Sequence, residues 1–395
     1  MVAACLMVLT LPFGASAWAQ SRAGSLSFAE PPLGLPQPPE VAARAYVLQD
    51  LASMQTLAAR QADQRIEPAS LTKLMTAYLV FQAIDAGKLQ AQQKWAVSEL
   101  AWKTGLNSGS RSHLAAGTEV SVDDLLKGMI VHSGNDATVA LAEGLAGSVD
   151  AFVERMNRQA QAFGLKATQF RNPEGRVVAG HFSTPREMAM IAARLVSDFP
   201  KSLAYFSLKE ATLGGVKQPS RNVLLWRDPT IDGLQTSYAE GAGYGLAVTS
   251  QRTLGGASRR LIAVVVGTSS PESRASEGQK LLNWGHGAFD VIKLFSANQS
   301  VVDAPVWKGA SSKVPVGRLQ PIMVVVPKGQ GSGLKTQLVR QDPLLAPLTR
   351  GQTVATLKIS LAGQPWQDVP LQALEPVPSA GWLGRAWDAI RLGVQ

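Results

Sequence analysis

Strand-type and helix-type segments follow one another along this 395-residue chain in an order that leaves few possible folds. A strand with a turn fits residues 43–54, and strand-type patterns return at 242–251 and 260–266. The segment 260–266 is a β-branched run, which is typical of a buried strand. Helix-type patterns lie between them, at 121–132, 149–163 and 184–199. Helices enclosed by early and late strands predict one α+β domain with a central antiparallel sheet, over residues 41–290.

Beyond Leu294 the pattern becomes purely strand-like. Short strand candidates separated by Gly, Pro and Asp lie at 301–307, 314–319, 322–326, 336–339 and 353–361. This spacing is typical of a small all-β domain, which we place at residues 291–375. We find no catalytic constellation within this segment.

The N-terminus has the pattern of a secretory signal. An apolar run from Ala3 to Phe13 is followed by small residues up to Ala19, which predicts a cleaved signal peptide over 1–19. A Pro-rich linker over 20–40 would follow it. The only cysteine, Cys5, lies in the signal, so the exported protein would have no disulfide. We therefore expect a periplasmic protein; an uncleaved anchor is the alternative, although the run is short for a membrane span.

Residues 379–395 predict an amphipathic C-terminal helix. One face would carry Leu383, Ala386, Trp387, Ile390 and Val394, and the other Arg385, Asp388, Arg391 and Gln395. Tryptophan favours the membrane interface, so we expect this helix to lie on the outer face of the inner membrane. A helix that docks on its own domain is the alternative. The net charge of +9 suits an anionic lipid or cell-wall surface. No Lys/Arg stripe with interleaved aromatic residues indicates nucleic acid.

Ser70 and Lys73 form the first candidate catalytic pair. Positions i and i+3 share a helix face, so the lysine amine can reach the serine hydroxyl. The apolar run that follows, from Leu74 to Ile84, predicts a buried helix. Ser70 is then an activated nucleophile with a lysine base, or else an ordinary helix N-cap. A second Ser-x-x-Lys, at Ser332–Lys335, lies in a Gly-rich stretch that we interpret as a surface turn.

Ser133-Gly134-Asn135 is the candidate second motif, because it follows a predicted helix at a distance that can bring it beside Ser70. Ser-x-Asn also occurs at 220–222 and 296–298, without that context. His132 precedes Ser133, but adjacent residues rarely face each other, so we interpret it as structural. The four histidines are scattered without ligand spacing, and we predict no metal and no cofactor.

Together these motifs resemble those of penicillin-recognising serine enzymes. The segments 67–81, 131–139, 180–190, 222–233 and 280–285 resemble the low-molecular-mass penicillin-binding proteins, which are exported serine-type D-alanyl-D-alanine carboxypeptidases of the peptidase S11 type. The resemblance runs from about residue 41 to the end. It implies the penicillin-binding/β-lactamase-like transpeptidase fold, a β-rich domain and a membrane-anchoring helix. It also implies peptidoglycan stem peptides as the substrate and β-lactam antibiotics as ligands.

The resemblance assigns a role to each motif residue. Ser70 would attack the carbonyl between the two terminal D-alanines and form an acyl-enzyme, with Lys73 as general base. Ser133 would relay a proton to the leaving amine, and Asn135 would bind the substrate amide. The backbone N–H groups of Ser70 and Tyr238 would form the oxyanion hole.

The third motif departs from the family. Its Lys-Thr-Gly occurs literally at 103–105, but this copy precedes Ser133 and we interpret it as a coincidence in a loop. The family position reads Gln235-Thr236-Ser237, which would bind the substrate carboxylate without a lysine charge. Ser237 would also add a side chain against the substrate. Arg274 aligns with a basic residue that helps to hold the carboxylate, so we expect a weakened enzyme.

Two other functions stay open. A class A β-lactamase needs a general-base glutamate between the second and third motifs, and no Glu-x-x-Leu-Asn signature occurs there. A non-catalytic peptidoglycan-binding homologue is supported only by the altered third motif. Acyl-enzyme detection by mass spectrometry would separate the three.

Overall fold

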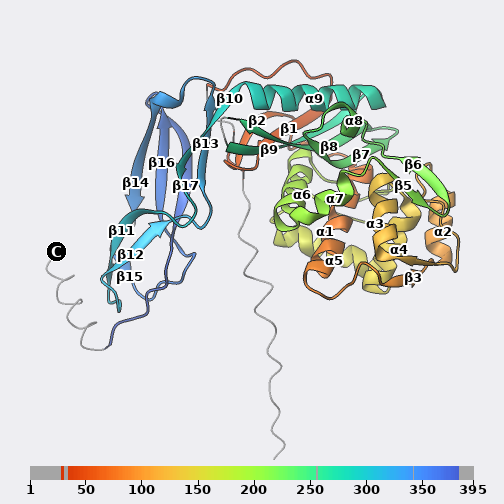
Figure 1. Cartoon of the computed structure of the whole chain (residues 1–395), viewed down its shortest axis with the longest axis horizontal. Coiled ribbons are helices and arrows are strands. Elements are labelled where there is room, and N and C mark those ends of the chain that lie inside the picture. The colour runs from red at the N-terminus through yellow and green to blue at the C-terminus, as the bar shows by residue number, and fades with distance from the viewer. Residues whose placement is uncertain (1–27, 31–33, 255–256, 341, 382–395) are drawn as a thin grey trace, which may run out of the picture.

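A five-stranded antiparallel sheet forms the centre of the larger part of the molecule (Figure 1). The computed structural model describes residues 28–30, 34–254, 257–340 and 342–381. The strand order is β2-β1-β9-β8-β7, so β7 is an edge strand. The strands are β1 (Ala45–Asp50), β2 (Gln55–Arg60), β7 (Ile231–Ala239), β8 (Gly243–Leu254) and β9 (Ala257–Thr268).

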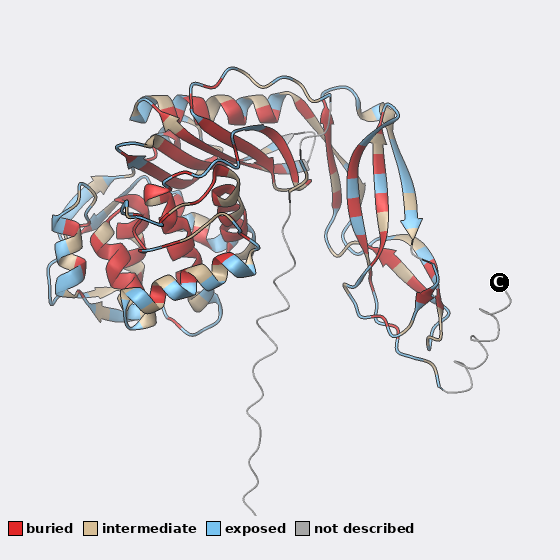
Figure 2. Ribbon diagram, turned by 180° about the vertical axis from the view of Figure 1, so that it is seen from behind, coloured by how far each residue is buried: buried red, intermediate tan, exposed pale blue. Residues whose placement is uncertain are grey.

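Helices cover both faces of this sheet. The long helix α9 (Pro271–Gly287) packs on one face, and a block of helices covers the other (Figure 1). Side chains of β1 alternate accordingly: Ala45 and Val47 enter the core on the side of the helical block, and Tyr46 and Leu48 enter the core under α9. Because both faces are buried, the central strands read as nearly continuous apolar runs rather than as alternating patterns (Figure 2).

The helical block is built around α1 (Lys73–Asp85), whose residues from Lys73 to Phe81 are all buried. Around it lie α2 (Glu99–Leu106), α3 (Val122–Val131), α4 (Asn135–Ala146), α5 (Val149–Ala162), α6 (Pro185–Asp198) and α7 (Leu203–Phe206). The short helix α8 (Leu224–Arg227) instead packs into the core under α9. Two short two-stranded sheets complete this part: β3 (Lys94–Ala96) pairs with β4 (Glu119–Ser121), which follows α2, and β5 (Glu210–Leu213) forms a hairpin with β6 (Val216–Pro219). The helices predicted at 121–132, 149–163 and 184–199 are thus confirmed.

The start of α6 differs in one respect from its sequence pattern. Thr184 and Glu187 have the spacing of a capping box, and the Thr184 hydroxyl does accept the Glu187 N–H at 3.1 Å. The Glu187 carboxylate does not return to Thr184. It accepts the N–H groups of Lys166 and Ala167 at 2.8 and 2.9 Å, and so fixes the preceding loop to the helix.

The smaller part of the molecule consists of strands. A six-stranded sheet has the order β14-β16-β17-β12-β11-β15, and β10 pairs with β13 beside it. The strands are β10 (Phe289–Phe295), β11 (Ser300–Trp307), β12 (Lys313–Gly317), β13 (Ile322–Pro327), β14 (Leu334–Arg340), β15 (Leu344–Leu345), β16 (Thr353–Leu361) and β17 (Gln364–Ala373). The predicted α+β class, with its separate all-β part, is confirmed. The sequence patterns missed β10, β15 and β17.

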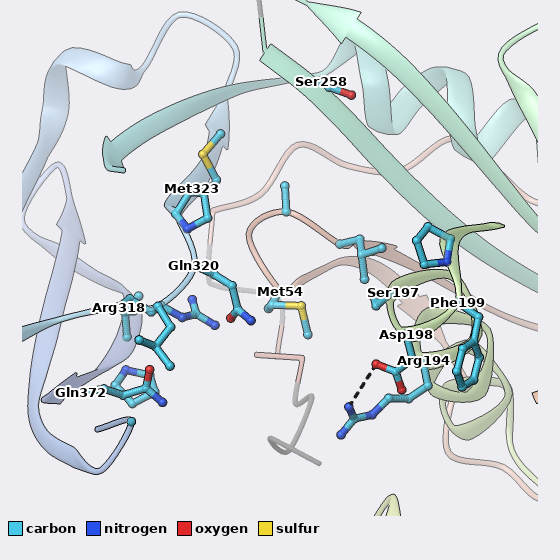
Figure 3. A pocket seen from close by; sticks show the side chains of 18 of the residues that line it. Met54, Arg194, Ser197, Asp198, Phe199, Ser258, Arg318, Gln320, Met323 and Gln372 are labelled. Carbon is cyan, nitrogen blue, oxygen red and sulfur yellow. Dashed lines mark ion pairs between the residues drawn. The ribbon is translucent and has the colours of Figure 1, made fainter. Parts of the chain in front are cut away.

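The turn between β1 and β2 joins the two parts. The Gln55 side-chain oxygen accepts the Val325 N–H at 3.0 Å, and the Gln367 amide donates to the Ser53 carbonyl at 2.8 Å. Beside this joint lies an open cleft of about 2500 Å³. Figure 3 shows Arg194 and Asp198, an ion pair on α6, on one wall, and Arg318 and Gln372 on the other. The joint depends on side-chain amides that reach backbone groups across the boundary.

The chain ends are mostly outside the described residues. The predicted signal peptide over 1–19 and most of the linker and of the helix predicted at 379–395 are therefore not described. Ser379 is described and forms a bridge with Gly309 rather than a helical turn. Within the described ranges, no helix is long and apolar enough to cross a membrane.

A fully buried ion pair between β1 and β9 holds the β1–β2 turn in place. Arg259 on β9 pairs with Asp50 at the end of β1, and both side chains are completely excluded from solvent. Asp50 also accepts the Ser53 N–H at 2.7 Å, and Arg259 donates to the Gly285 carbonyl of α9 at 2.7 Å. The pair therefore connects the turn, the sheet and α9 through charged hydrogen bonds in a dry environment.

We expect Asp50→Asn to lower the free energy of unfolding by about 3–5 kcal/mol, because it leaves the Arg259 charge buried without a partner. The matched control is Glu99→Gln, which breaks the Glu99–Lys103 pair at 2.9 Å, whose side chains are 71% and 56% exposed. That change should cost less than about 1 kcal/mol. Urea unfolding measures both, and equal effects would contradict the role assigned to the buried pair.

Candidate active site

Ser70 lies on a tight turn that runs directly into α1. Residues Ala69–Thr72 form a 3-10 helix, and the Ser70 side chain makes no capping hydrogen bond. The N-cap alternative for Ser70 is therefore wrong. Ala69 has a left-handed backbone, with φ of 46°, which is strained for a residue with a Cβ. The loop at Gly175 packs so closely on this turn that a Cβ there would lie 1.8 Å from the Ala69 carbonyl oxygen.

The Lys73 amine is buried at the centre of the site, with its residue only 2% exposed. Its Nζ donates to Ser70 Oγ at 3.0 Å, to Asn135 Oδ1 at 2.8 Å and to the Glu174 carbonyl at 2.8 Å. Burial lowers the pKa of Lys73 to about 7; the nearby Arg221 charge acts in the same direction, and the carboxyls of Glu174 and Asp136 oppose it. A substantial neutral fraction at pH 7 follows, as a general base requires.

The second motif lies between α3 and α4. Ser133 is a left-handed residue, with φ of 58°, whose hydroxyl accepts a hydrogen bond from the Gln235 amide at 3.0 Å. Gly134 has no room for a side chain, because a Cβ would lie 1.9 Å from Ser112 Oγ. Asn135 begins α4 and contacts Lys73. The structure thus brings Ser70 and Asn135 into contact with the Lys73 amine, and Ser133, two residues before Asn135, into contact with Gln235 of the third motif.

Other motif copies and the neighbouring histidine lie elsewhere. His132 contacts the Ala211 carbonyl through Nε2 at 3.0 Å, and burial lowers its pKa. It is therefore a structural residue. The Lys-Thr-Gly at 103–105 forms the last turn of α2, so the prediction that it lies in a loop is wrong. The second Ser-x-x-Lys begins in a short 3-10 turn at Gly331–Gly333, as expected for a surface turn.

The altered third motif lies on β7, the edge strand that packs against the Ser70 turn. Gln235 and Thr236 are buried, and Gln235 makes the hydrogen bond to Ser133. Ser237 is buried too. Its Oγ would lie 2.5 Å from a Cβ on Gly245, the residue directly opposite on β8. The extra side chain thus occupies space that a glycine on the neighbouring strand leaves free.

Arg274, in the first turn of α9, donates a hydrogen bond to the backbone of β7. Its Nη1 donates to the Ser237 carbonyl at 3.0 Å, and its Nη2 reaches the Arg221 carbonyl at 3.5 Å. The guanidinium also lies over the Tyr244 ring, 5.6 Å from its centroid. Tyr238 carries an exposed side chain whose ring centroid is 4.5 Å from that of Tyr244.

Two charged residues near Lys73 were not predicted from the sequence. Glu174, with a side chain only 3% exposed, lies next to Lys73 in a loop between the second and third motifs. Arg221 donates to the Gly109 carbonyl at 2.9 Å and acts on the pKa of both Lys73 and Arg274 through its charge. Arg221 directly precedes the segment 222–233 that carries the family resemblance, which was the only available signal. Glu174 lies in an Asn-Pro-Glu-Gly sequence at 172–175, which is typical of a turn and indicates no chemistry.

A serine with a buried lysine base beside an open strand edge defines an acyl-transferring serine enzyme. Comparisons with known proteins agree. The family model for D-alanyl-D-alanine carboxypeptidase matches residues 34–270, and that for the C-terminal domain of penicillin-binding protein 5 matches 289–379. D-alanyl-D-alanine carboxypeptidase DacC of Escherichia coli (strain K12) is 39% identical over 359 residues, which are 90% of this chain and 89% of DacC.

Two solved structures are similar as well. Penicillin-binding protein 5 from Haemophilus influenzae has a TM-score of 0.80 and 38% identity, and the match covers 87% of this chain and all of that one. Penicillin-binding protein D2 from Listeria monocytogenes, in its cefotaxime-bound form, has a TM-score of 0.56 and 30% identity, covering 64% of this chain and all of that one. The chain belongs to the family of serine-type D-alanyl-D-alanine carboxypeptidases, which are hydrolases.

The contact between Gly175 and the Ser70 turn gives a stability prediction. Gly175→Ala should cost about 1–2 kcal/mol for its left-handed backbone, with φ of +87°, and about 1–3 kcal/mol more for overpacking against Ala69. Gly164→Ala is the matched control: Gly164 has φ of +75° but nothing within 4 Å of its Cβ position. It should show the backbone cost alone in urea unfolding. Equal losses of unfolding free energy in the two variants would show that the loop at Gly175 shifts to make room for the added Cβ.

Proposed function

We propose that this chain removes the terminal D-alanine from peptidoglycan stem pentapeptides through an acyl-enzyme on Ser70. The observation that carries the assignment is the 3.0 Å contact between Lys73 Nζ and Ser70 Oγ, at an amine with a pKa of about 7. Neutral Lys73 takes the hydroxyl proton as Ser70 Oγ attacks the carbonyl. The bond to the last D-alanine then breaks, and Ser133 passes a proton to the leaving amine.

Asn135 and β7 align the substrate in this proposal. The oxyanion is bound by the N–H groups of Ser70 and Tyr238. Arg274 supports the second of these, because it donates to the Ser237 carbonyl, which belongs to the same peptide unit as the Tyr238 N–H. A charged hydrogen bond on one end of a peptide fixes its plane and polarises the other end. Arg274 is then a positioning residue as well as a nearby cation.

Recognition of the terminal carboxylate differs from the pattern of the family. Gln235 offers an amide and Thr236 a hydroxyl, while the cations Arg221 and Arg274 lie beyond them. Burial and the Arg221 charge lower the pKa of Arg274 to about 10, so it stays protonated at neutral pH. A neutral hydrogen bond contributes about 1 kcal/mol, against about 1.5–3 for a charged one. We infer a working enzyme whose affinity for the carboxylate is reduced.

Location and ligands complete the proposal. The signal pattern supports export to the periplasm, and the amphipathic C-terminal sequence supports attachment to the outer face of the inner membrane. β-Lactams would acylate Ser70 because their amide presents a carbonyl and a carboxylate like those of the peptide. The cefotaxime-bound relative supports this ligand class.

Restoring the missing charge tests the carboxylate argument. Gln235→Lys should raise kcat/KM for diacetyl-Lys-D-Ala-D-Ala on the order of tenfold. Ser237→Gly should change it little, because the Ser237 side chain is accommodated by Gly245. The matched control is an acyl donor without a terminal carboxylate, on which Gln235→Lys should have no such effect. A natural protein as fast as Gln235→Lys would contradict the argument.

The pH dependence of acylation tests the nucleophile and base together. The rate of fluorescent penicillin labelling should fall about tenfold per pH unit below a midpoint near 7, because protonated Lys73 cannot accept the Ser70 proton. Burial has the largest effect on that midpoint, and the charges of Glu174, Arg221 and Asp136 adjust it, so Arg221→Gln should move it to higher pH by removing a like charge. Ser70→Ala should abolish labelling. Labelling of Ser70→Ala, or none of the natural protein, would refute the proposed function.

A further inference from the structure

The open cleft beside the joint is larger than a site for a small molecule. Its volume of about 2500 Å³ exceeds the range of about 300–1,000 Å³ that is usual for ligand pockets. The end of α6 and the residues after it form one wall, and segments of the β-rich part around Arg318 and Gln372 form the other (Figure 3). A cleft of this size between two walls fits a segment of a polymer.

Two arginines lie on neighbouring segments of the β-rich wall. Asn298 fixes both of them, because its N–H donates to the Arg318 carbonyl at 2.9 Å and its Oδ1 accepts from Arg350 Nη2 at 3.2 Å. The residues that follow the arginines are also in contact, since a Cβ on Gly351 would lie 3.7 Å from Leu319 Cδ1. The fold therefore holds two guanidinium-bearing residues close together at the cleft.

The cations of the cleft have few anionic partners. Arg318 is half-buried and burial lowers the pKa of its guanidinium, yet no group among the described residues accepts a hydrogen bond from it. Lys293 on the same wall and Lys201 on the facing wall form no ion pair within the described ranges. Of the described residues on the β-rich wall, Asp368 alone carries a carboxylate. An anionic ligand would compensate a guanidinium that is partly withdrawn from water.

We propose that this cleft binds a peptidoglycan strand, with Arg318 and Arg350 contacting the carboxylates of its stem peptides. The identity of the polymer rests on the proposed function, because the strand that carries the substrate peptides is the anionic polymer that such an enzyme meets. Side-chain amides fit the same ligand: Gln320, Gln352 and Gln372 line this wall and can bond to the N-acetyl and hydroxyl groups of the sugars. A flat membrane surface also carries anionic headgroups, but it cannot enter a cleft between two walls.

The cleft is a second site, separate from the reactive serine. It lies at the β1–β2 turn, whereas the Ser70 turn packs against β7, and β2 and β7 are the opposite edges of the five-stranded sheet. With about 4.8 Å between neighbouring strands, these edges are roughly 19 Å apart. One part of a peptidoglycan strand can therefore be held at the cleft while another stem peptide reaches Ser70. Binding at the cleft should thus lower KM for polymeric substrate and leave a small free peptide unaffected.

Co-sedimentation of the full chain with isolated peptidoglycan sacculi tests the cleft, in a Ser70→Ala background so that no acyl-enzyme contributes to binding. Arg318→Gln combined with Arg350→Gln should weaken binding about tenfold, because two charged hydrogen-bonding groups are removed. The matched control is Lys335→Gln combined with Lys358→Gln, which removes the same charge from exposed positions of β14 and β16 outside the cleft. Its affinity should stay within about twofold of the parent.

Two further measurements separate the cleft from the serine and from any misfolding of the arginine variant. Lys201→Gln changes only the facing wall and should weaken binding about threefold. With Ser70 restored, the arginine double variant should raise KM for the release of D-alanine from sacculi. It should leave kcat/KM for diacetyl-Lys-D-Ala-D-Ala unchanged, because that peptide is too small to occupy both sites.

Three outcomes would contradict a part of this scheme. Equal losses of sacculus binding in the arginine and lysine double variants, or no loss in either, would overturn this inference alone. So would an arginine variant that loses binding to phosphatidylglycerol vesicles but keeps binding to sacculi, because the cleft would then be a lipid site. A natural protein that neither hydrolyses the small peptide nor reacts with fluorescent penicillin would overturn the proposed function instead.

Discussion

Burial of the Lys73 amine is the interaction on which the site depends. An ammonium group excluded from water is costly unless it is paired, so it releases its proton more readily than a solvated lysine. Three oxygen acceptors, on Ser70, Asn135 and Glu174, hold the amine in one position. Each of these belongs to a different segment of the fold. The catalytic geometry is therefore a consequence of how α1, α4 and the loop before α6 pack together.

The sequence predicted those features that a local pattern can encode. The buried helix behind Ser70 was visible as an apolar run, and the sheet was visible in the β-branched run at 260–266. Ser70, Lys73, Ser133 and Asn135 were predicted from two short motifs and their order; Ser70, Lys73 and Asn135 are in direct contact, and Ser133 contacts Gln235. The strand β17 was missed because its two prolines argue against a strand, although its residues 368–373 do alternate in burial. In β10 the adjacent apolar residues Val291 and Ile292 break the alternation, and β15 has only two residues.

Features that arise only in three dimensions could not be predicted. The spacing of Thr184 and Glu187 fits a capping box, but the Glu187 carboxylate binds the loop at 166–167, which the fold brings beside it. Ser237 was expected to add a side chain against the substrate; its Oγ lies beside Gly245 on the paired strand, in space that a side chain there would fill. Glu174 and Arg221 were not recognised because nothing in their neighbours along the chain shows that both lie within electrostatic reach of Lys73.

Gln235 stands where the family has a lysine, and a cation at this position of β7 could serve both substrate binding and the activation of Lys73. A lysine there would bind the substrate carboxylate and would also disfavour the protonated form of Lys73. In this chain burial is the largest influence on the pKa of Lys73, and Arg221 adds to it from another segment. Gln235 still donates to Ser133, so the hydroxyl of the second motif stays oriented. Activation of the nucleophile thus depends mainly on groups outside β7, and we expect the substitution to act mainly on substrate binding.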